Sequence, residues 1–240
     1  MNKQAKKTLH IVSKIDKLQS KISHNQQKQL VKELLLIGIQ GQEELLELLI
    51  NRRINNKIRL SYLDSIIFEF LVNSDYSSIS EAIKYYFPNG LVYLKSNLSS
   101  NYQSLQNLLI MHRYQEADKL TQQKLCQIAG LNTDNKRDWL YFTDIMGLPS
   151  EDLITINSLW QVYSRYKFGF LTQRRIWISN NCDWEKLWHQ IGWKNNGVPR
   201  RYPEDFLWNV DAPDGHLPLF NQLRGVQVLS ALFNHVAWNE

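Results

Sequence analysis

A chain of 240 residues is long enough for one large domain or two modest ones, each with its own core. No stretch approaches the roughly 20 apolar residues that a membrane span needs, so we expect a soluble protein. The two cysteines, Cys126 and Cys182, lie far apart and have no CxxC partner. This excludes a disulfide framework and a cysteine-based zinc site, and it favours a reducing compartment.

The net charge of +5 is confined to the first part of the chain. Residues 1–100 carry 14 Lys and Arg against 9 Asp and Glu, whereas residues 101–240 carry 14 of each. All eight Trp lie at or beyond Trp139, away from the basic segment. Nucleic-acid-binding proteins usually combine basic and aromatic residues on one surface, so we expect no nucleic-acid partner. The lysine-rich N-terminus is interpreted as a solvated helix face, with an anionic partner or a membrane surface as alternatives.

The first ninety residues predict a series of short amphipathic helices. Apolar residues recur at helical spacing in three successive segments, which cover residues 30–35, 45–49 and 60–71. Ser78, followed three residues later by Glu81, has the pattern of a capping box for a helix that runs to Phe87. The turn residues Pro88-Asn89-Gly90 end that helix. We therefore expect an N-terminal helical bundle over residues 1–92, of a kind used for protein contacts.

Residues 91–103, rich in Ser and Asn, predict a connection to a second helical domain over residues 103–240. Its helices are predicted over residues 104–128, 139–145, 151–166, 183–191 and 221–234, and Asp183 is suited to cap the fourth. Between Gly192 and Pro218 the regular pattern fails, yet the segment is rich in aromatic residues. Loops this long are uncommon in compact domains and tend to be functional.

The sequence offers no constellation typical of an enzyme. It has no glycine-rich phosphate loop, no HxxxH or HExxH pair, and no Ser or Cys in a nucleophile elbow. The neighbouring acids Glu151-Asp152 and Glu204-Asp205 do not share a helix face, so they do not form carboxylate pairs. We therefore expect a protein that is not an enzyme, without catalytic residues and without a metal site of its own.

Five blocks in the second domain carry a family resemblance. They read YQEADKLT (114–121), DWLYFT (138–143), DLITINSLW and KFGFLTQ (152–160 and 167–173), IGWK (191–194) and APDGHLP (212–218). In this order they resemble the Genomes Uncoupled Four family, the tetrapyrrole-binding activators of magnesium chelatase. The resemblance implies an all-α protein in which an N-terminal helical bundle is followed by a cupped, all-helical porphyrin-binding domain. It also implies two mobile loops at the ligand, which fall on 130–136 and 192–218.

The ligands implied by the resemblance are protoporphyrin IX and magnesium protoporphyrin IX, with no tightly bound cofactor. A porphyrin is a flat, largely apolar disc with two propionates on one edge, so it needs apolar walls and a few polar groups at the rim. Arg137 and Arg224 are candidate propionate partners, and Asn221 is a candidate oxygen ligand for a bound magnesium. The candidate walls are Phe142, Ile145, Trp193, Tyr202, Phe206, Trp208 and Leu217.

Two positions depart from the family pattern. The family carries two arginines one turn apart on the last helix, and here Gln227 stands at the second position. The long loop of the family commonly carries a Trp where this chain has Tyr202. Because an exposed Arg–propionate pair contributes only about 0–1 kcal/mol, we expect weaker or re-oriented binding rather than its loss.

The resemblance further implies a partner and a location. The partner is the porphyrin-binding large subunit of magnesium chelatase, with peripheral membrane association as an open option, and the chain is expected to be a monomer. The lean toward Asn, Lys and Ile suggests AT-rich coding, which favours the chloroplast stroma of a plastid over the cyanobacterial cytoplasm. Two alternatives remain: a helical interaction scaffold that has lost tetrapyrrole binding, and a single-strand nucleic-acid binder.

Overall fold

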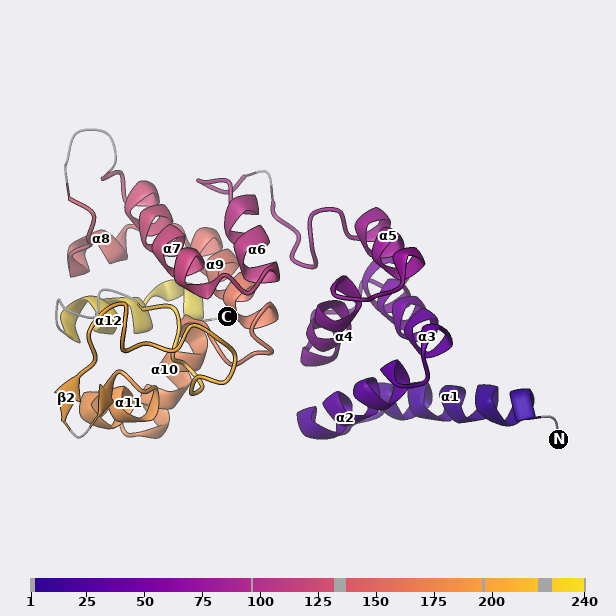
Figure 1. Ribbon diagram of the computed structural model, residues 1–240. Coiled ribbons are helices and arrows are strands. Elements are labelled where there is room, and N and C mark those ends of the chain that lie inside the picture. Colours follow the sequence, from indigo (N-terminus) through magenta and orange to yellow (C-terminus); the bar gives the residue numbers. More distant parts are fainter. Residues whose placement is uncertain (1–2, 96, 132–136, 196, 220–225, 240) are drawn as a thin grey trace. The chain divides into compact units, whose positions relative to one another are not determined.

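The computed structural model describes residues 3–95, 97–131, 137–195, 197–219 and 226–239 (Figure 1). The chain divides into two compact units, residues 1–91 and 92–240. Helices build both units, and the prediction of an all-α fold is confirmed. Within the described ranges the only strands are β1 (Lys194–Asn195) and β2 (Val198–Pro199), which pair as one antiparallel hairpin.

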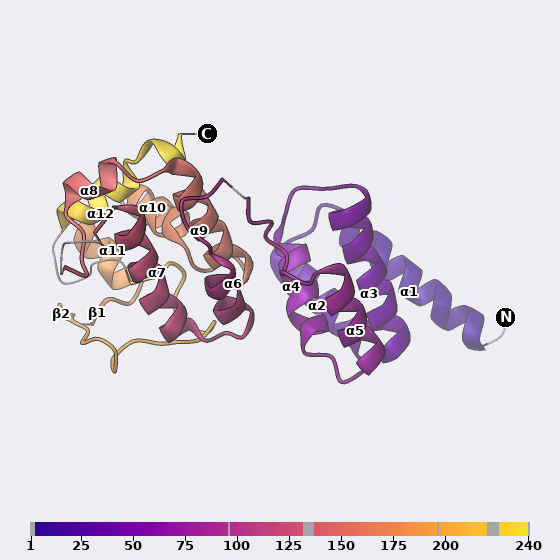
Figure 2. The same cartoon turned by 90° about the horizontal axis from the view of Figure 1, so that it is seen from above.

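The first unit is a bundle of short helices. Its elements are α1 (Lys3–Gln19), α2 (His24–Leu35), α3 (Ile39–Ile50), the π-helical turn η1 (Asn51–Asn55), α4 (Tyr62–Val72) and α5 (Ser77–Tyr86). The helices α2, α3 and α4 pack on one another, α1 packs on α2 and α3, and α5 packs on α3 and α4 (Figure 2). A Cβ at Gly41 would meet the carbonyl oxygen of Leu34 at 2.0 Å, so a glycine is needed where α3 approaches the end of α2.

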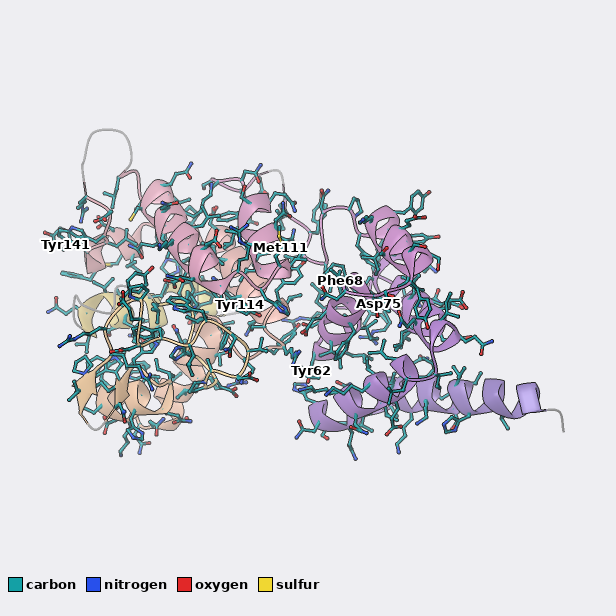
Figure 3. The ribbon with its side chains drawn as sticks, viewed as in Figure 1. Tyr62, Phe68, Asp75, Met111, Tyr114 and Tyr141 are labelled. Carbon is teal, nitrogen blue, oxygen red and sulfur yellow. The ribbon has the colours of Figure 1, made fainter. Side chains whose placement is uncertain are left out.

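The apolar stripes predicted from the sequence form the core of this unit. Fully buried aliphatic side chains come from α2, α3 and α4: Val31, Leu34, Leu45, Leu49, Leu63, Ile66, Ile67 and Leu71. Aromatic pairs extend the core. Tyr62 stacks on the His24 ring with centroids 4.0 Å apart, and Phe68 meets Phe87 edge to face at 6.1 Å (Figure 3).

The helix starts in this unit differ in part from the prediction. Capping boxes open α2, where the Ser23 backbone N–H donates to Gln26 at 3.0 Å, and α4, where Ser61 and Asp64 pair. The capping box predicted at Ser78 is wrong. The helix α5 begins at Ser77, and its N-cap makes no side-chain hydrogen bond.

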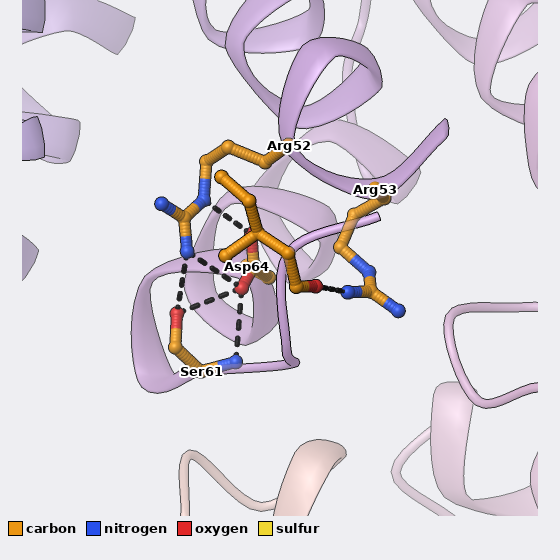
Figure 4. Close-up of polar contacts among 5 residues, drawn as sticks. Arg52, Arg53, Ser61 and Asp64 are labelled. Atoms are coloured by element: carbon orange, nitrogen blue, oxygen red, sulfur yellow. Dashed lines mark hydrogen bonds and ion pairs between the residues drawn. The ribbon is translucent and has the colours of Figure 1, made fainter. Parts of the chain in front are cut away.

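A buried ion pair closes the loop after η1 (Figure 4). The fully buried carboxylate of Asp64 accepts Arg52 Nε at 2.7 Å and Arg52 Nη2 at 3.1 Å. It also accepts the backbone N–H of Ser61 at 2.9 Å, while Arg52 Nη2 donates to Ser61 Oγ at 3.0 Å. The next arginine, Arg53, donates to the carbonyl of Ile58. Each oxygen of the buried carboxylate is therefore satisfied by at least one donor.

The second unit is built around an aromatic core. Its helices are α6 (Gln103–Ile110), α7 (Tyr114–Ile128), α8 (Phe142–Met146), α9 (Ser150–Val162), α10 (Phe170–Ser179), α11 (Trp184–Gln190), α12 (Val226–Phe233) and the 3-10 turn η2 (Val236–Trp238). The Tyr114 ring lies 6.0 Å from that of Trp160 and 5.6 Å from that of Phe168, and its hydroxyl donates to the carbonyl of Tyr163 at 2.6 Å (Figure 3). The Trp160 indole N–H donates to Thr121 at 3.0 Å.

Several element boundaries differ from the sequence prediction. The helix predicted over 104–128 is two helices, because the chain turns at Met111–Arg113 with His112 at a positive φ of 55°. The helix α10 was not predicted, since its buried face is made largely of polar and aromatic residues. The segment expected to be a connection packs on this unit: Tyr102 is fully buried and donates to Asp152 at 2.6 Å.

Two further expectations concern the helices of this unit. Asp183 caps α11 as predicted, because its Oδ1 accepts the backbone N–H groups of Glu185 at 3.0 Å and Lys186 at 3.1 Å. The helix predicted over 221–234 is observed as α12, and residues 220–225 lie outside the described ranges. None of the described helices is long and apolar enough to cross a membrane.

Candidate ligand-binding site

A buried histidine, His216, holds the first half of the segment 192–219 in place through hydrogen bonds. His216 Nε2 accepts the backbone N–H of Leu207 at 3.1 Å, which leaves Nδ1 to donate to the Ile191 carbonyl at 2.7 Å. The Trp193 indole N–H donates to the His216 carbonyl at 2.8 Å, and the Phe206 ring lies 5.4 Å from the imidazole. Burial lowers the pKa of His216, and the hydrogen bond to Ile191 opposes that shift. The imidazole is therefore held neutral, with its proton on Nδ1.

The second half of the segment is fastened from α10 and from the turn before it. The Gln173 amide on α10 donates to the carbonyls of Gly215 and Pro218, both at 2.9 Å. Lys167 donates from Nζ to the Val210 carbonyl at 2.6 Å, and its own carbonyl accepts the Gly215 N–H at 2.7 Å. Although the segment has almost no regular structure, side chains of the core hold its backbone in place.

Gly215 is needed where the segment crosses the core. Its φ is +76°, in the left-handed region that favours glycine. A Cβ there would lie 3.0 Å from Ile191 Cγ2 and 3.1 Å from Ile176 Cδ1. The backbone conformation and the space available both therefore require a glycine.

The end of the segment is fastened by a buried carboxyl group on α7. Asp118 Oδ1 accepts the backbone N–H of Leu219 at 2.6 Å. Burial raises the pKa of Asp118 to about 7, against smaller opposing effects of this hydrogen bond and of Lys119. The pKa of the Tyr202 phenol is also raised, first by its own burial and then by the negative charge of Asp118. The field of the carboxyl thus reaches an aromatic residue that the sequence placed at the ligand.

The structure divides the predicted walls into two groups. Ile145, Trp193, Phe206 and Leu217 are buried and pack as part of the core. Phe142 and Tyr202 are 45% and 39% exposed, and Trp208 is half-buried. Trp208 donates to the Pro203 carbonyl at 3.0 Å and meets the Tyr202 ring edge to face at 5.9 Å. The predicted wall residues that have exposed surface are therefore Phe142, Tyr202 and part of Trp208, whereas the buried group belongs to the core.

The candidate propionate partner Arg137 is already engaged. Its guanidinium contacts Asp144 at 2.9 and 3.0 Å and lies over the rings of Trp139 and Tyr141, 5.2 and 4.5 Å from their centroids. Asp144 also accepts the Tyr141 N–H at 2.7 Å, which opens α8. The buried Nη1 of Arg137 has no hydrogen-bond partner among the described residues. The N–H groups of Nη1 therefore lack an acceptor within the described part of the chain.

An exposed apolar edge lies beside this arginine on α8. Tyr141, which directly precedes α8 and is labelled in Figure 3, is 51% exposed. Met146, the last residue of α8, is 75% exposed, and Phe142 lies between the two in the chain. The other side of α8 packs on α12, which places Ile145 in the core. Gln227, the departure noted in the sequence, is exposed on α12.

Other predicted parts of the site lie outside the described residues. They are Asn221, Arg224 and residues 132–136 of the first predicted loop. Within the described part of the chain, no three His, Cys, Asp or Glu side chains gather in a way that could hold a metal ion. A cavity of about 540 Å³ lies between α11 and the β1–β2 hairpin, but polar side chains such as Glu185, Lys186 and Lys194 line it, which does not suit a porphyrin ring.

Comparison with known proteins decides the family. A family model described as GUN4-like matches residues 95–236, which is more than half of the chain. The chain belongs to the GUN4 family. The region matched by the GUN4 model contains every residue that the sequence analysis assigned to the ligand.

The GUN4 region is shared with proteins from several organisms. The chain is 54% identical over 177 residues to the uncharacterized protein ycf53 of Porphyra purpurea, covering 74% of both chains. It is 33% identical over 143 residues to the chloroplastic tetrapyrrole-binding protein of Arabidopsis thaliana, covering 56% of this chain and 54% of that one. The structure of GUN4 from Chlamydomonas reinhardtii matches with a TM-score of 0.55 and 36% identity, over 61% of this chain and 95% of that chain.

The polar groups that hold the long segment were not among the site residues predicted from the sequence. Asp118, Gln173 and His216 all stand within the GUN4-like blocks, yet only the aromatic residues were assigned a role. A usable signal was present for Asp118, because it shares a helix face with Ala117 and Thr121, and all three are buried. A carboxyl group on a buried face needs a specific partner, and here that partner is a backbone N–H from a distant segment.

Proposed function

We propose that the chain binds protoporphyrin IX and magnesium protoporphyrin IX without transforming them, and that it regulates magnesium chelatase in chlorophyll synthesis. The observation that carries the proposal is the GUN4-like match over residues 95–236. One relative of that family is named a tetrapyrrole-binding protein. The match spans both the aromatic segment and the apolar edge on α8.

The accessible residues suit such a ligand. Phe142 and Tyr202 offer ring faces on elements that the core holds in place, so little order needs to be gained on binding. Burial of apolar porphyrin surface, at about 25 cal/mol per Å², supplies most of the affinity. Nη1 of Arg137, which has no hydrogen-bond partner among the described residues, is a candidate donor for a propionate. It would orient the ligand rather than determine the strength of binding.

The partner and the location are parts of the same proposal. The large porphyrin-binding subunit of magnesium chelatase is the partner that the family resemblance implies for a non-catalytic, monomeric carrier. The chloroplastic relative in Arabidopsis supports a plastid location, in the stroma or at a membrane surface, with the cyanobacterial cytoplasm as the alternative. A direct check is the rate of magnesium insertion by purified chelatase, which we expect to rise when this chain is added.

The experiment that tests ligand binding is a titration with deuteroporphyrin and its magnesium form, followed by quenching of Trp fluorescence. We expect saturation with a Kd of about 1 μM, or about −8 kcal/mol. Phe142→Ala and Tyr202→Ala should weaken binding several-fold, because each removes an accessible ring face. Tyr93→Ala is the matched control, since Tyr93 is 85% exposed in the same unit and is not part of the predicted site.

The outcomes separate the candidate functions. If porphyrin causes no quenching while circular dichroism shows an intact fold, the helical interaction scaffold becomes the better hypothesis. Binding of single-stranded RNA with a steep salt dependence, in place of porphyrin, would support the nucleic-acid alternative. Equal weakening by all three alanine variants would show that the predicted walls are not the site.

A further inference from the structure

Asp118 is a buried carboxyl group that the proposed function does not yet use. It is 5% exposed, and its hydrogen bond to Leu219 joins positions 101 residues apart in the chain. A buried carboxylate is costly unless it is paired. The only cation among the described residues whose field favours the charged form of Asp118 is Lys119, its neighbour on α7.

The position of this carboxyl connects α7 with the long aromatic segment that carries Tyr202. Leu219, whose N–H it accepts, is the last described residue of that segment. The ring of Tyr202 is accessible, and the negative charge of Asp118 contributes to the raised pKa of its phenol group. A ligand that covers Tyr202 would therefore lie within the field of the same carboxyl group.

We propose that Asp118 is a positioning residue of the tetrapyrrole site whose carboxyl group takes up a proton when the ligand binds, so that affinity falls as the pH rises above neutrality. This inference rests on the proposed function. The ligand excludes water and adds negative charge, and both effects disfavour a carboxylate relative to a neutral carboxyl group. In its neutral form Asp118 still accepts the Leu219 N–H and so still holds the end of the segment.

Among the ionisable groups on the elements around Asp118, Asp118 is the one expected to titrate near pH 7. Burial raises the pKa of Asp118 to about 7, although the Leu219 hydrogen bond and the charge of Lys119 act in the opposite direction. The helix α6, which packs on α7, carries no ionisable side chain. On α9, Asp152 is engaged by Tyr102 and Glu151 by Lys95. The imidazole of His216 titrates at lower pH, because burial lowers its pKa.

The test is the pH dependence of binding in Asp118→Asn. Asparagine keeps an oxygen that accepts the Leu219 N–H but cannot ionise. Magnesium deuteroporphyrin would be titrated into the full chain from pH 6.5 to 8.5, with Trp quenching as the readout. We expect the affinity of the native protein to fall as the pH rises above 7, by at most about tenfold per pH unit, and that of the variant to stay level. Asp152→Asn is the matched control, a second buried aspartate of the same unit, and should keep the native slope.

A second measurement does not depend on the variant. Calorimetric titration of the native protein at pH 7.5, in buffers of different ionisation enthalpy, reports protons taken up per ligand bound. We expect uptake of at most about three quarters of a proton, because a group with a pKa of about 7 is already about one quarter protonated at pH 7.5. Zero uptake, or the same pH slope in Asp118→Asn as in the native chain, would overturn this inference and leave ligand binding standing. No binding at any pH would overturn the proposed function, and this inference with it.

Discussion

The imidazole of His216 and the backbone N–H of Leu207 form a hydrogen bond of 3.1 Å that only an unprotonated Nε2 can accept. Because Nδ1 already faces the Ile191 carbonyl at 2.7 Å, the ring has no room for a second proton without losing one of its two backbone contacts. The His216 side chain therefore links the aromatic segment to the end of α11, and protonation of the imidazole at acid pH would break one of these hydrogen bonds.

The first prediction concerns acid stability. The folded-state pKa of His216 is lowered, so its contribution to stability is present above the unfolded-state pKa of about 6.5 and is lost as the pH falls below it. His216→Ala should lower the free energy of unfolding by about 2–4 kcal/mol at pH 7.5, through two lost hydrogen bonds and a cavity. It should also flatten the loss of stability between pH 6.5 and 5.

Urea unfolding of both proteins at four pH values between 5 and 8 measures this. His189→Ala, at an exposed position on α11, is the control and should leave the pH dependence unchanged. An acid slope that is equally steep in His216→Ala would assign the sensitivity to another group, such as His235, whose pKa burial also lowers.

The second prediction separates the two reasons for glycine at position 215. Gly215→Ala meets both a positive φ of 76° and a contact of 3.0 Å to Ile191. Gly197→Ala, on the β1–β2 hairpin, meets a φ of 79° but no atom within 4 Å. We expect about 1 kcal/mol of destabilisation for Gly197→Ala and about 2–4 kcal/mol for Gly215→Ala, measured by denaturant unfolding. Equal losses of stability in the two variants would show that the side chains of Ile191 and Ile176 can move to accommodate a methyl group.

The third prediction concerns the buried ion pair of the first unit. Asp64→Ala leaves the Arg52 guanidinium with its charge largely buried and unpaired, which costs about 3–5 kcal/mol. The double variant Arg52→Met/Asp64→Leu removes both charges and should recover most of that loss. Thermal unfolding followed by circular dichroism gives the comparison. A double variant as unstable as Asp64→Ala would mean that the hydrogen bonds to Ser61, rather than the unpaired charge, dominate.

Helical periodicity predicted the fold because apolar stripes follow from the spacing of buried residues alone. The stripe through Leu63, Ile66 and Ile67 is fully buried, as its pattern indicates. Caps were less predictable, since a box pattern competes with other local hydrogen bonds. Ser61 with Asp64 forms such a box, whereas the pattern at Ser78 does not. A capping-box pattern in the sequence therefore shows only that such a cap is possible, and the packing of the helix determines its first residue.

The long segment could be located from its prolines, glycines and aromatic residues, but the roles of those residues could not. Trp193 and Tyr202 look alike in the sequence, yet one donates to a buried carbonyl and the other is exposed. The contacts that hold the segment, from His216 to Leu207 and from Asp118 to Leu219, exist only in the folded chain. Because Asp118 is next to Lys119 in the sequence, it would be predicted to be a surface acid. Only the folded chain shows that it is buried against the distant Leu219.

The last prediction restores the charge that this chain lacks at position 227. Gln227 is exposed on α12, three residues after Arg224, so an arginine there would stand one turn further along the last helix predicted from the sequence. Because an exposed ion pair contributes about 0–1 kcal/mol, Gln227→Arg should tighten binding of deuteroporphyrin up to about fivefold. Screening should remove the gain at 1 M salt.

Two controls show whether charge is the cause of that gain. Gln227→Met keeps the length of the side chain without the charge and should bind as the native chain does. The dimethyl ester of deuteroporphyrin, which lacks ionised propionates, should bind both variants alike. Tightening by Met, or tightening that survives high salt and esterification, would place the contact at position 227 on the apolar ring instead of the propionate rim.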